Sequence, residues 1–173
     1  MNVIDYLNEQ QTKYEVVQHK PAYTAEQLSR VEHLPAPQVA KTVVVEADGR
    51  FYLCVLPADR KIDFFALQKH LNANQVRLAD EDQMALLFLD AEVGAEVPFG
   101  HLYNLPTLLD KALLRDKEIS FLAGRHDVSV HMKMEDYLRL ARPSVLKFSY
   151  PAQAERFLDP YFFDPYLDNN FLP

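Results

Sequence analysis

Residues 39–56, VAKTVVVEADGRFYLCVL, decide the fold of this chain. Two runs rich in β-branched, aromatic and aliphatic residues, Val39 to Glu46 and Phe51 to Leu56, stand on either side of Asp48-Gly49. An Asp-Gly pair between two such runs is typical of a tight turn joining antiparallel strands, because both turn residues need a left-handed backbone. The stretch therefore predicts a β-hairpin in the middle of the molecule.

The regions around the hairpin alternate between helical and strand patterns. Thr24-Ala25-Glu26-Gln27 has the form of a capping box and predicts a short helix to about Val31. Asp63 is placed to cap a helix that runs through Leu71. The remaining expected elements are a helix around Val3–Leu7, strands at 14–17, 76–78, 107–109, 118–122 and 128–132, and helices at 81–87 and 135–140. This order has no strict βαβ repeat, so we expect an α/β (α+β) fold with a mixed sheet curled around one core.

The chain is expected to form one domain with a C-terminal extension. Its 173 residues fit a single domain. From Pro143 onward the composition changes, since five of the eleven prolines and eight of the twenty aromatic residues lie in the last 31 positions. We therefore divide the chain into a domain at 1–142 and an extension at 143–173. Aromatic residues such as Phe157 and Tyr161 would pack the extension on the domain or present it to a partner.

Charge and cysteine content limit the classes of function. The net charge of -7 disfavours loose binding to DNA or RNA, because such affinity comes from cations that displace phosphate counterions. Any RNA contact should be local. Cys54 is the one cysteine, which excludes a disulfide within the chain and indicates a reducing compartment, the cytoplasm. The first residues contain no export signal and no apolar run is long enough for a membrane helix, so no membrane contact is expected.

The usual signatures of nucleophilic and metal-dependent enzymes are absent from the sequence. It contains no Gly-x-Ser-x-Gly, His-Glu-x-x-His, Cys-x-x-Cys or phosphate-loop motif, and we expect neither a metal nor another cofactor. His126 and His131 are five residues apart, a spacing that points side chains to opposite faces of a strand. They are a poor pair for metal binding.

Two features can form a site of another kind. Lys41 begins the run Lys41 to Val45 and shares a strand face with Val43 and Val45. It either borders a pocket or is an edge-strand lysine that discourages aggregation. The segment Gly94 to His101 carries two glycines that permit close approach of a ligand to the backbone, and Pro98 fixes its path. This segment is either a binding loop or a plain connection.

The order of several short motifs resembles the YbaK-type editing family. These motifs are Tyr23-Thr24-Ala25-Glu26, Val39-Ala40-Lys41-Thr42, Leu53 to Asp59, the Gly-x-x-x-Pro loop Gly94 to Pro98, and Leu122-Ala123-Gly124-Arg125-His126. The family includes free-standing aminoacyl-tRNA deacylases and the editing domain inserted in bacterial prolyl-tRNA synthetases. The resemblance covers roughly residues 14 to 140.

The resemblance implies a barrel-like mixed sheet with flanking helices and a pocket between the lysine strand and the glycine loop. It assigns Lys41 an electrostatic catalytic role near the terminal adenosine. The residues expected to bind substrate are Tyr23, Thr24, Gly94, Ala95, Glu96, Val97, Pro98, His101, Gly124 and His126. An activated ester needs little more than positioning and a cation, so the absence of a catalytic triad agrees with this mechanism.

The function implied by the resemblance is trans-acting hydrolysis of mischarged aminoacyl-tRNA, gripped at its acceptor end. A synthetase or other carrier could supply further affinity. The alternative is a noncatalytic module of the same fold that recognises a nucleotide or a protein. A filled pocket, or Lys41 held in a surface ion pair, would favour that module.

Overall fold

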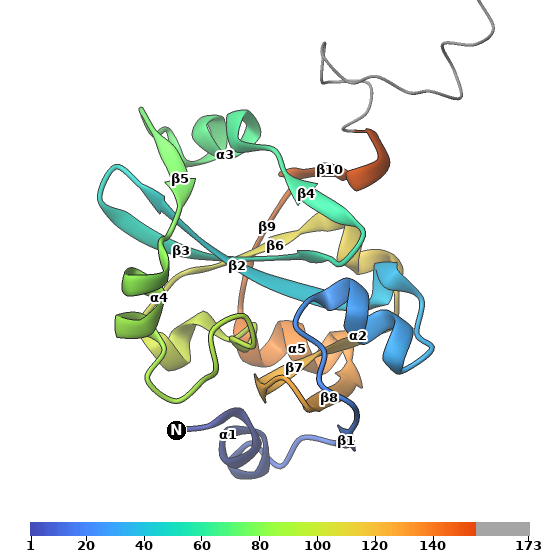
Figure 1. The fold of residues 1–173 in the computed structure, drawn as a ribbon. Coiled ribbons are helices and arrows are strands. Elements are labelled where there is room, and N and C mark those ends of the chain that lie inside the picture. The colour runs from blue at the N-terminus through green and yellow to red at the C-terminus, as the bar shows by residue number, and fades with distance from the viewer. Residues whose placement is uncertain (155–173) are drawn as a thin grey trace, which may run out of the picture.

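The computed structural model describes residues 1–154 of the chain (Figure 1). The α-helices are α1 (Val3–Glu9), α2 (Ala25–Val31), α3 (Phe64–Leu71), α4 (Glu81–Leu87) and α5 (Met134–Ala141). The strands are β1 (Tyr14–Gln18), β2 (Ala40–Ala47), β3 (Arg50–Pro57), β4 (Arg60–Ile62), β5 (Val76–Leu78), β6 (Thr107–Asp110), β7 (Glu118–Arg125), β8 (Val128–Lys133), β9 (Ser144–Leu146) and β10 (Ser149–Pro151). Four 3-10 turns are η1 (Ala36–Gln38), η2 (Gly100–Tyr103), η3 (Lys111–Arg115) and η4 (Ala152–Ala154).

The central hairpin is confirmed. β2 and β3 pair antiparallel along their full length, from Ala40 opposite Pro57 to Ala47 opposite Arg50. Asp48 and Gly49 form the turn with φ values of 48° and 86°, the left-handed region that such a turn requires. The Asp48 side chain also accepts hydrogen bonds from the backbone N–H groups of residues 74 and 75, at 2.8 and 3.0 Å. The turn residue thereby fixes the start of β5.

The strands are arranged in three open sheets, and the predicted barrel-like sheet is wrong for residues 1–154. The five-stranded sheet has the order β5-β2-β3-β6-β9, with parallel pairs at β3–β6 and β6–β9, so the sheet is mixed as expected. The other two are β1-β8-β7 and β10-β4. One isolated bridge, Val39 to Ser120, joins the three-stranded sheet to the start of β2. A single bridge does not continue the hydrogen bonding around a closed barrel.

Both faces of the central hairpin are buried. Val44, Leu53 and Val55 belong to a core shared with α1, α5 and the three-stranded sheet. Val45 and Cys54 belong to a second core under α3. Figure 1 shows the same arrangement, with α3 on one side of β2 and β3, and α1, α5, β7 and β8 on the other. The sequences of β2 and β3 therefore do not alternate between polar and apolar residues, because both faces of these strands are buried.

The predicted helices and long strands are present within one or two residues of the expected bounds, except that β7 continues to Arg125, three residues beyond the predicted end. The Thr24 hydroxyl accepts from the N–H of Gln27 at 3.1 Å and begins α2. The Gln27 side chain accepts from the N–H of Tyr23 at 2.8 Å, one residue before the position a capping box would give. The 3-10 turn η2 begins at Gly100, within the segment Gly94 to His101 that was predicted to be a binding loop or a plain connection.

Part of the C-terminal extension pairs with the body of the domain. β9 is parallel to β6, and β10 is antiparallel to β4. The aromatic residues from Phe157 onward, which we predicted to pack on the domain or bind a partner, lie outside the described residues. Within residues 1–154, no helix is both long enough and apolar enough to cross a membrane.

Candidate active site

A cavity of about 350 Å³ opens between the N-terminal end of α2, the start of β2 and the loop at Gly94. It is within the range of small-ligand pockets. It is lined by Tyr23, Thr24, Ala25, Glu26, Ala40, Lys41, Thr42, Val43, Ala58, Gly94, Glu96 and Leu122. Five of the predicted site residues are thus brought together from three separate parts of the sequence: Tyr23, Thr24, Lys41, Gly94 and Glu96.

Lys41 contributes the cation of this cavity. It lies at the start of β2, where the strand leaves η1, and it is half-buried. Burial lowers the pKa of its ammonium group and Lys61 lowers it further, whereas Glu26 and Asp59 oppose the shift. Among residues 1–154 the ammonium group has no hydrogen bond or ion pair. The cation is therefore available to a ligand, as the pocket interpretation of Lys41 requires.

Glu96 contributes a carboxyl group to the same cavity. The residue is only 4% exposed, and its Oε1 accepts a hydrogen bond from the N–H of Gly94 at 2.8 Å. Burial raises the pKa of this carboxyl, while the backbone N–H groups of Gly94 and Glu96 and the nearby His126 hold it down. A half-buried cation and a buried carboxyl thus line one cavity. Such a combination suits a ligand that carries both signs of charge.

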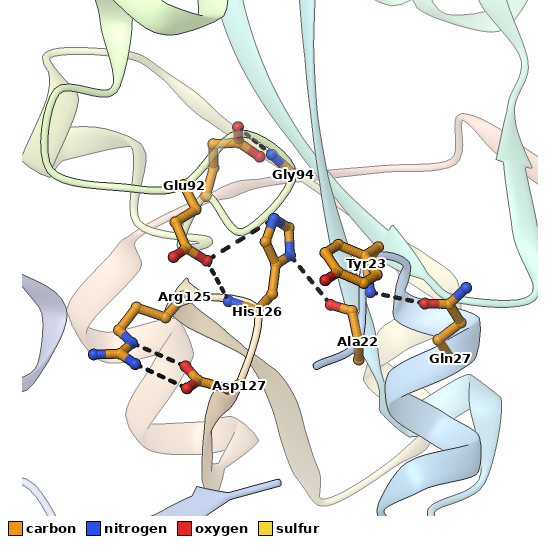
Figure 2. Close-up of polar contacts among 9 residues, drawn as sticks. Ala22, Tyr23, Gln27, Glu92, Gly94, Arg125, His126 and Asp127 are labelled. Carbon is orange, nitrogen blue, oxygen red and sulfur yellow. Dashed lines mark hydrogen bonds and ion pairs between the residues drawn. The ribbon is translucent and has the colours of Figure 1, made fainter. Parts of the chain in front are cut away.

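His126 lies against the Gly94 loop and beside Tyr23 (Figure 2). Its Nδ1 is 3.2 Å from the carbonyl oxygen of Ala22, and since a carbonyl only accepts, Nδ1 carries the proton. Glu92 accepts from the backbone N–H of His126 at 2.8 Å, and its carboxylate is 4.0 Å from Nε2. The ring centroids of His126 and Tyr23 are 4.8 Å apart. The imidazole is thus held in one orientation beside Tyr23 and Gly94, which line the cavity, but His126 itself is not one of the lining residues.

The remaining predicted residues of the Gly94 loop, and Gly124, do not line the cavity but pack against the loop that does. Ala95, Val97 and Pro98 are buried. The N–H of Gly124 donates to the carbonyl of Ala95 at 3.0 Å, and the hydroxyl of Tyr137 donates to the carbonyl of Pro98 at 2.8 Å. Gly124 has φ +87°, a conformation that favours glycine. These contacts fix the path of the loop that carries Gly94 and Glu96.

His101 is not brought to this cavity. The turn η2 directs it to another hollow, where its ring lies 4.9 Å from that of Tyr6 and near Arg142. Burial lowers the pKa of the His101 imidazole, and the charge of Arg142 lowers it further. Its place close to the glycine loop in sequence therefore does not make it a neighbour of Lys41.

Seven cavity residues were not among the predicted site residues: Ala25, Glu26, Ala40, Thr42, Val43, Ala58 and Leu122. Glu26 could have been predicted from the sequence, because it lies in the first turn of α2, next to the Thr24 cap that was expected at the site. No pattern in the sequence places Ala58 or Leu122 there. Within residues 1–154, no cluster of three or more His, Cys, Asp or Glu side chains could hold a metal ion.

Comparisons with known proteins identify the family. Residues 19–140 match the model of the aminoacyl-tRNA editing domain. The chain is 30% identical over 151 residues to the multifunctional Ser/Thr-tRNA deacylase ProXp-y of Escherichia coli K12, covering 84% of this chain and 90% of the relative. It is 31% identical over 131 residues to the prolyl-tRNA editing protein ProX of Acetoanaerobium sticklandii, covering 75% of this chain and 76% of that relative.

The fold also recurs in a solved structure. The crystal structure of hypothetical protein APE2540 superposes with a TM-score of 0.78 at 19% identity, over 86% of this chain and 99% of that one. The family match spans the α2 cap, the lysine strand, the glycine loop and His126, the segments that the resemblance to YbaK-type proteins rests on. The chain therefore belongs to the aminoacyl-tRNA editing domain family.

Proposed function

We propose that this protein is a trans-acting aminoacyl-tRNA deacylase, which hydrolyses the ester of mischarged tRNA in translation quality control. The observation that carries the proposal is an open cavity lined by an unpaired lysine and a buried carboxyl, in a chain of the editing family. The relatives named a Ser/Thr-tRNA deacylase and a prolyl-tRNA editing protein support the same reaction class.

The charges of the cavity match those of the substrate end. An aminoacylated 3′ terminus carries phosphate negative charge on one side of the ester and an α-ammonium group on the other. Lys41 binds the phosphate or stabilises the oxyanion that develops when water attacks the ester carbonyl. Glu96 in its ionised form pairs with the α-ammonium group. Water displaces the ribose oxygen, which leaves with a proton, and the products are the free amino acid and uncharged tRNA.

The noncatalytic module is less well supported. It would be favoured by a filled cavity or by Lys41 held in an ion pair. The cavity is open, and the Lys41 ammonium has no ion-pair partner among the described residues. Both observations favour the enzyme.

The remaining expectations also belong to the proposal. We infer that the substrate side chain is small, such as alanine, serine or cysteine, and that the enzyme acts in the cytoplasm, where tRNA is charged. We further propose that residues 1–142 form the editing domain with 143–173 as its extension. A synthetase is a proposed partner that could supply affinity.

A panel of mischarged tRNAs tests the proposal directly. Each is labelled on the amino acid, and ester loss is followed with and without the protein. We expect accelerated loss for small amino acids and none for the correctly matched pair. Spontaneous rates for every member of the panel, in the presence of correctly folded protein, would exclude the enzyme and leave the binding module.

A further inference from the structure

A second hollow, of about 370 Å³, is lined mainly by basic side chains. Arg60 comes from β4, Lys111 and Arg115 from η3, and Lys147 from the link between β9 and β10. Asp110 is the one acidic residue in its lining. We call these four cations the basic hollow. The chain as a whole has a net charge of -7, so the basic hollow reverses the prevailing sign.

The acidic residue of the hollow is turned toward the backbone. Asp110 is 1% exposed, and its two carboxylate oxygens accept from the N–H groups of Ala112 and Phe148, both at 2.9 Å. Its charge is engaged in holding η3 and the segment before β10 in place. It is therefore a structural acceptor and offers no exposed carboxylate for the lysines to pair with.

The cations of the hollow are available to a ligand. Lys111, Arg115 and Lys147 are exposed, and their side chains have no hydrogen bond or ion pair within residues 1–154. Arg60 is held differently, because its guanidinium donates to the hydroxyl and carbonyl of Ser149 at 2.7 and 2.8 Å. One fixed and three unpaired cations around a concave surface suit an anionic ligand with several charges.

The basic hollow lies next to the candidate active site. Ala58 lines the cavity and Arg60 lines the hollow, so their Cα atoms are at most about 7.6 Å apart along the chain. Asp59 in the turn before β4 and Lys61 in β4 both influence the charge state of Lys41. η3 also packs against η1, the turn that leads into the lysine strand. These contacts connect the two sites, so the phosphates that follow an RNA 3′ end held in the cavity are the ones placed to reach the hollow.

We propose that the basic hollow binds phosphodiester groups of the acceptor stem, close to the aminoacylated end of the RNA. The inference rests on the proposed function for the identity of the RNA, but its charge argument is independent of hydrolysis. It reconciles the acidic chain with a polyanionic substrate, since a few cations in one place supply the local contact.

The test compares two double variants that remove the same charges from different places. The double variant Lys111→Gln with Arg115→Gln removes two of the four positive charges of the hollow. Lys13→Gln with Arg50→Gln removes one lysine and one arginine from exposed positions that do not line either cavity. Binding of an uncharged RNA minihelix with a single-stranded CCA end is measured by fluorescence anisotropy at several salt concentrations. Thermal unfolding checks the fold of both variants.

The hollow variant should bind the minihelix about tenfold more weakly at low salt, with a slope of log affinity against log salt shallower by about 2. The control variant should behave like the wild type. Equal binding by wild type and hollow variant would overturn the inference, since the cations of the hollow would then contact no RNA phosphate. Binding lost equally in both variants would overturn it too, since net charge alone would then decide affinity.

Hydrolysis provides a separate measurement. Loss of a short 3′-aminoacyl-adenosine ester, which has no stem phosphates, should proceed at the same rate in the hollow variant and the wild type. A wild-type protein that binds the minihelix through the hollow but hydrolyses no ester would refute the proposed function and keep this inference. The two failures are thus distinguishable.

Discussion

Lys41 occupies the position at which a single charge decides the chemistry. It lines the cavity at the start of β2 and contributes no buried contact on which the hairpin depends, because the apolar residues of β2 make those contacts. Lys41→Ala should therefore abolish deacylation, by at least about 100-fold in kcat, with little change in melting temperature. Ester loss from mischarged tRNA and thermal unfolding measure the two effects.

Lys41→Arg should restore little activity, because a planar guanidinium does not replace a compact ammonium group in a cavity of this size. Lys69→Ala, on the exposed face of α3, is the control and should remain fully active. Wild-type rates in Lys41→Ala would remove the lysine from the mechanism.

Two features of Gly94 restrict its replacement, a left-handed backbone conformation and the closeness of His126, and a matched pair of variants can separate their effects. Its φ is +91°, and a Cβ placed there would lie 3.4 Å from Cε1 of His126, at the edge of the cavity. Gly49 in the hairpin turn has a similar φ of +86°, but a Cβ there would meet nothing within 4 Å. Gly94→Ala and Gly49→Ala should each cost about 1 kcal/mol of stability through backbone strain, and only the former should impair hydrolysis.

Gly94→Val should extinguish hydrolysis, since a branched side chain would enter the space that the aminoacyl group needs. Calorimetry and single-turnover ester hydrolysis of the four proteins, wild type included, make the comparison. A fully active Gly94→Ala that loses the same stability as Gly49→Ala would assign the glycine to backbone geometry alone.

At the scale of elements, α2 is anchored at its C-terminal end by a buried polar cluster. Glu32, whose side chain is 4% exposed, accepts from the Ser129 hydroxyl and from Nε2 of His131 on β8, and lies 3.5 Å from Nε2 of His19. Burial raises the pKa of Glu32, but the hydrogen bonds from His131 and Ser129 outweigh it and leave a net lowering. The bond to Glu32 raises the pKa of His131. The cluster therefore holds α2, with its Thr24 cap, against β1 and β8.

The cluster should make stability depend on pH in a defined window. The raised pKa of His131 gives stability that is complete below the unfolded value of 6.5 and is lost as pH rises through the folded value. The lowered pKa of Glu32 gives stability that is complete above 4.5 and is lost as pH falls through the folded value. Both contributions are therefore complete between 4.5 and 6.5.

Glu32→Gln should lower the free energy of unfolding by about 3 kcal/mol near pH 5.5, with a smaller loss above pH 8. Denaturant titrations from pH 4 to pH 9 supply the values. Asp127→Asn breaks the exposed pair with Arg125 and should change stability little at any pH. A loss in Glu32→Gln that does not vary with pH would mean that packing, and not charge, explains the cluster.

The elements that could be predicted from the sequence are those with local signals. The Asp48-Gly49 turn, the Thr24 and Asp63 caps and the apolar runs of β2 and β3 are each recognisable within a few residues. β4, β9 and β10 were not predicted, because each has three residues and pairs with a distant partner, as Ser149 does with Ile62, whereas the equally short β5 stands between two helical patterns that mark its bounds. Three residues carry no periodicity, so their pairing is decided by tertiary packing.

The candidate site divides in the same way. Lys41 and Gly94 were predicted because a lysine in an apolar strand and a glycine-proline loop are unusual, and the family order joined them. His101 was expected in the cavity on its nearness in sequence, but the turn η2 places it beside Tyr6. The Glu32 cluster and the basic hollow were not predicted, because the residues of each are spread over more than eighty positions of the sequence.

For the whole molecule, the net charge of -7 limits how RNA is held. If the cavity and the basic hollow are the main contacts, only a few phosphates are neutralised. The logarithm of tRNA affinity should then fall against the logarithm of salt with a slope between about -2 and -4. Uncharged tRNA should bind more weakly than aminoacylated tRNA, because the ester end enters the cavity.

Titrations of both forms at several salt concentrations measure these slopes. A mischarged tRNA bound to Lys41→Ala, which should not hydrolyse it, keeps the ester intact during the experiment. A slope steeper than about -5 would require six or more phosphate contacts. It would mean that RNA also contacts a basic surface other than the cavity and the basic hollow.

Because Cys54 is buried in β3, the rate at which its thiol is labelled reports the unfolding of this strand. The thiol is the sole one in the chain, has no exposed surface, and its pKa is raised by burial. A maleimide or an aromatic disulfide reagent reacts with the exposed thiolate only, so labelling of the native protein waits for β3 to leave the sheet. One added surface cysteine could consequently be labelled with a fluorophore while the natural one stays in place, which gives single-site spectroscopy of tRNA docking without a cysteine-free background.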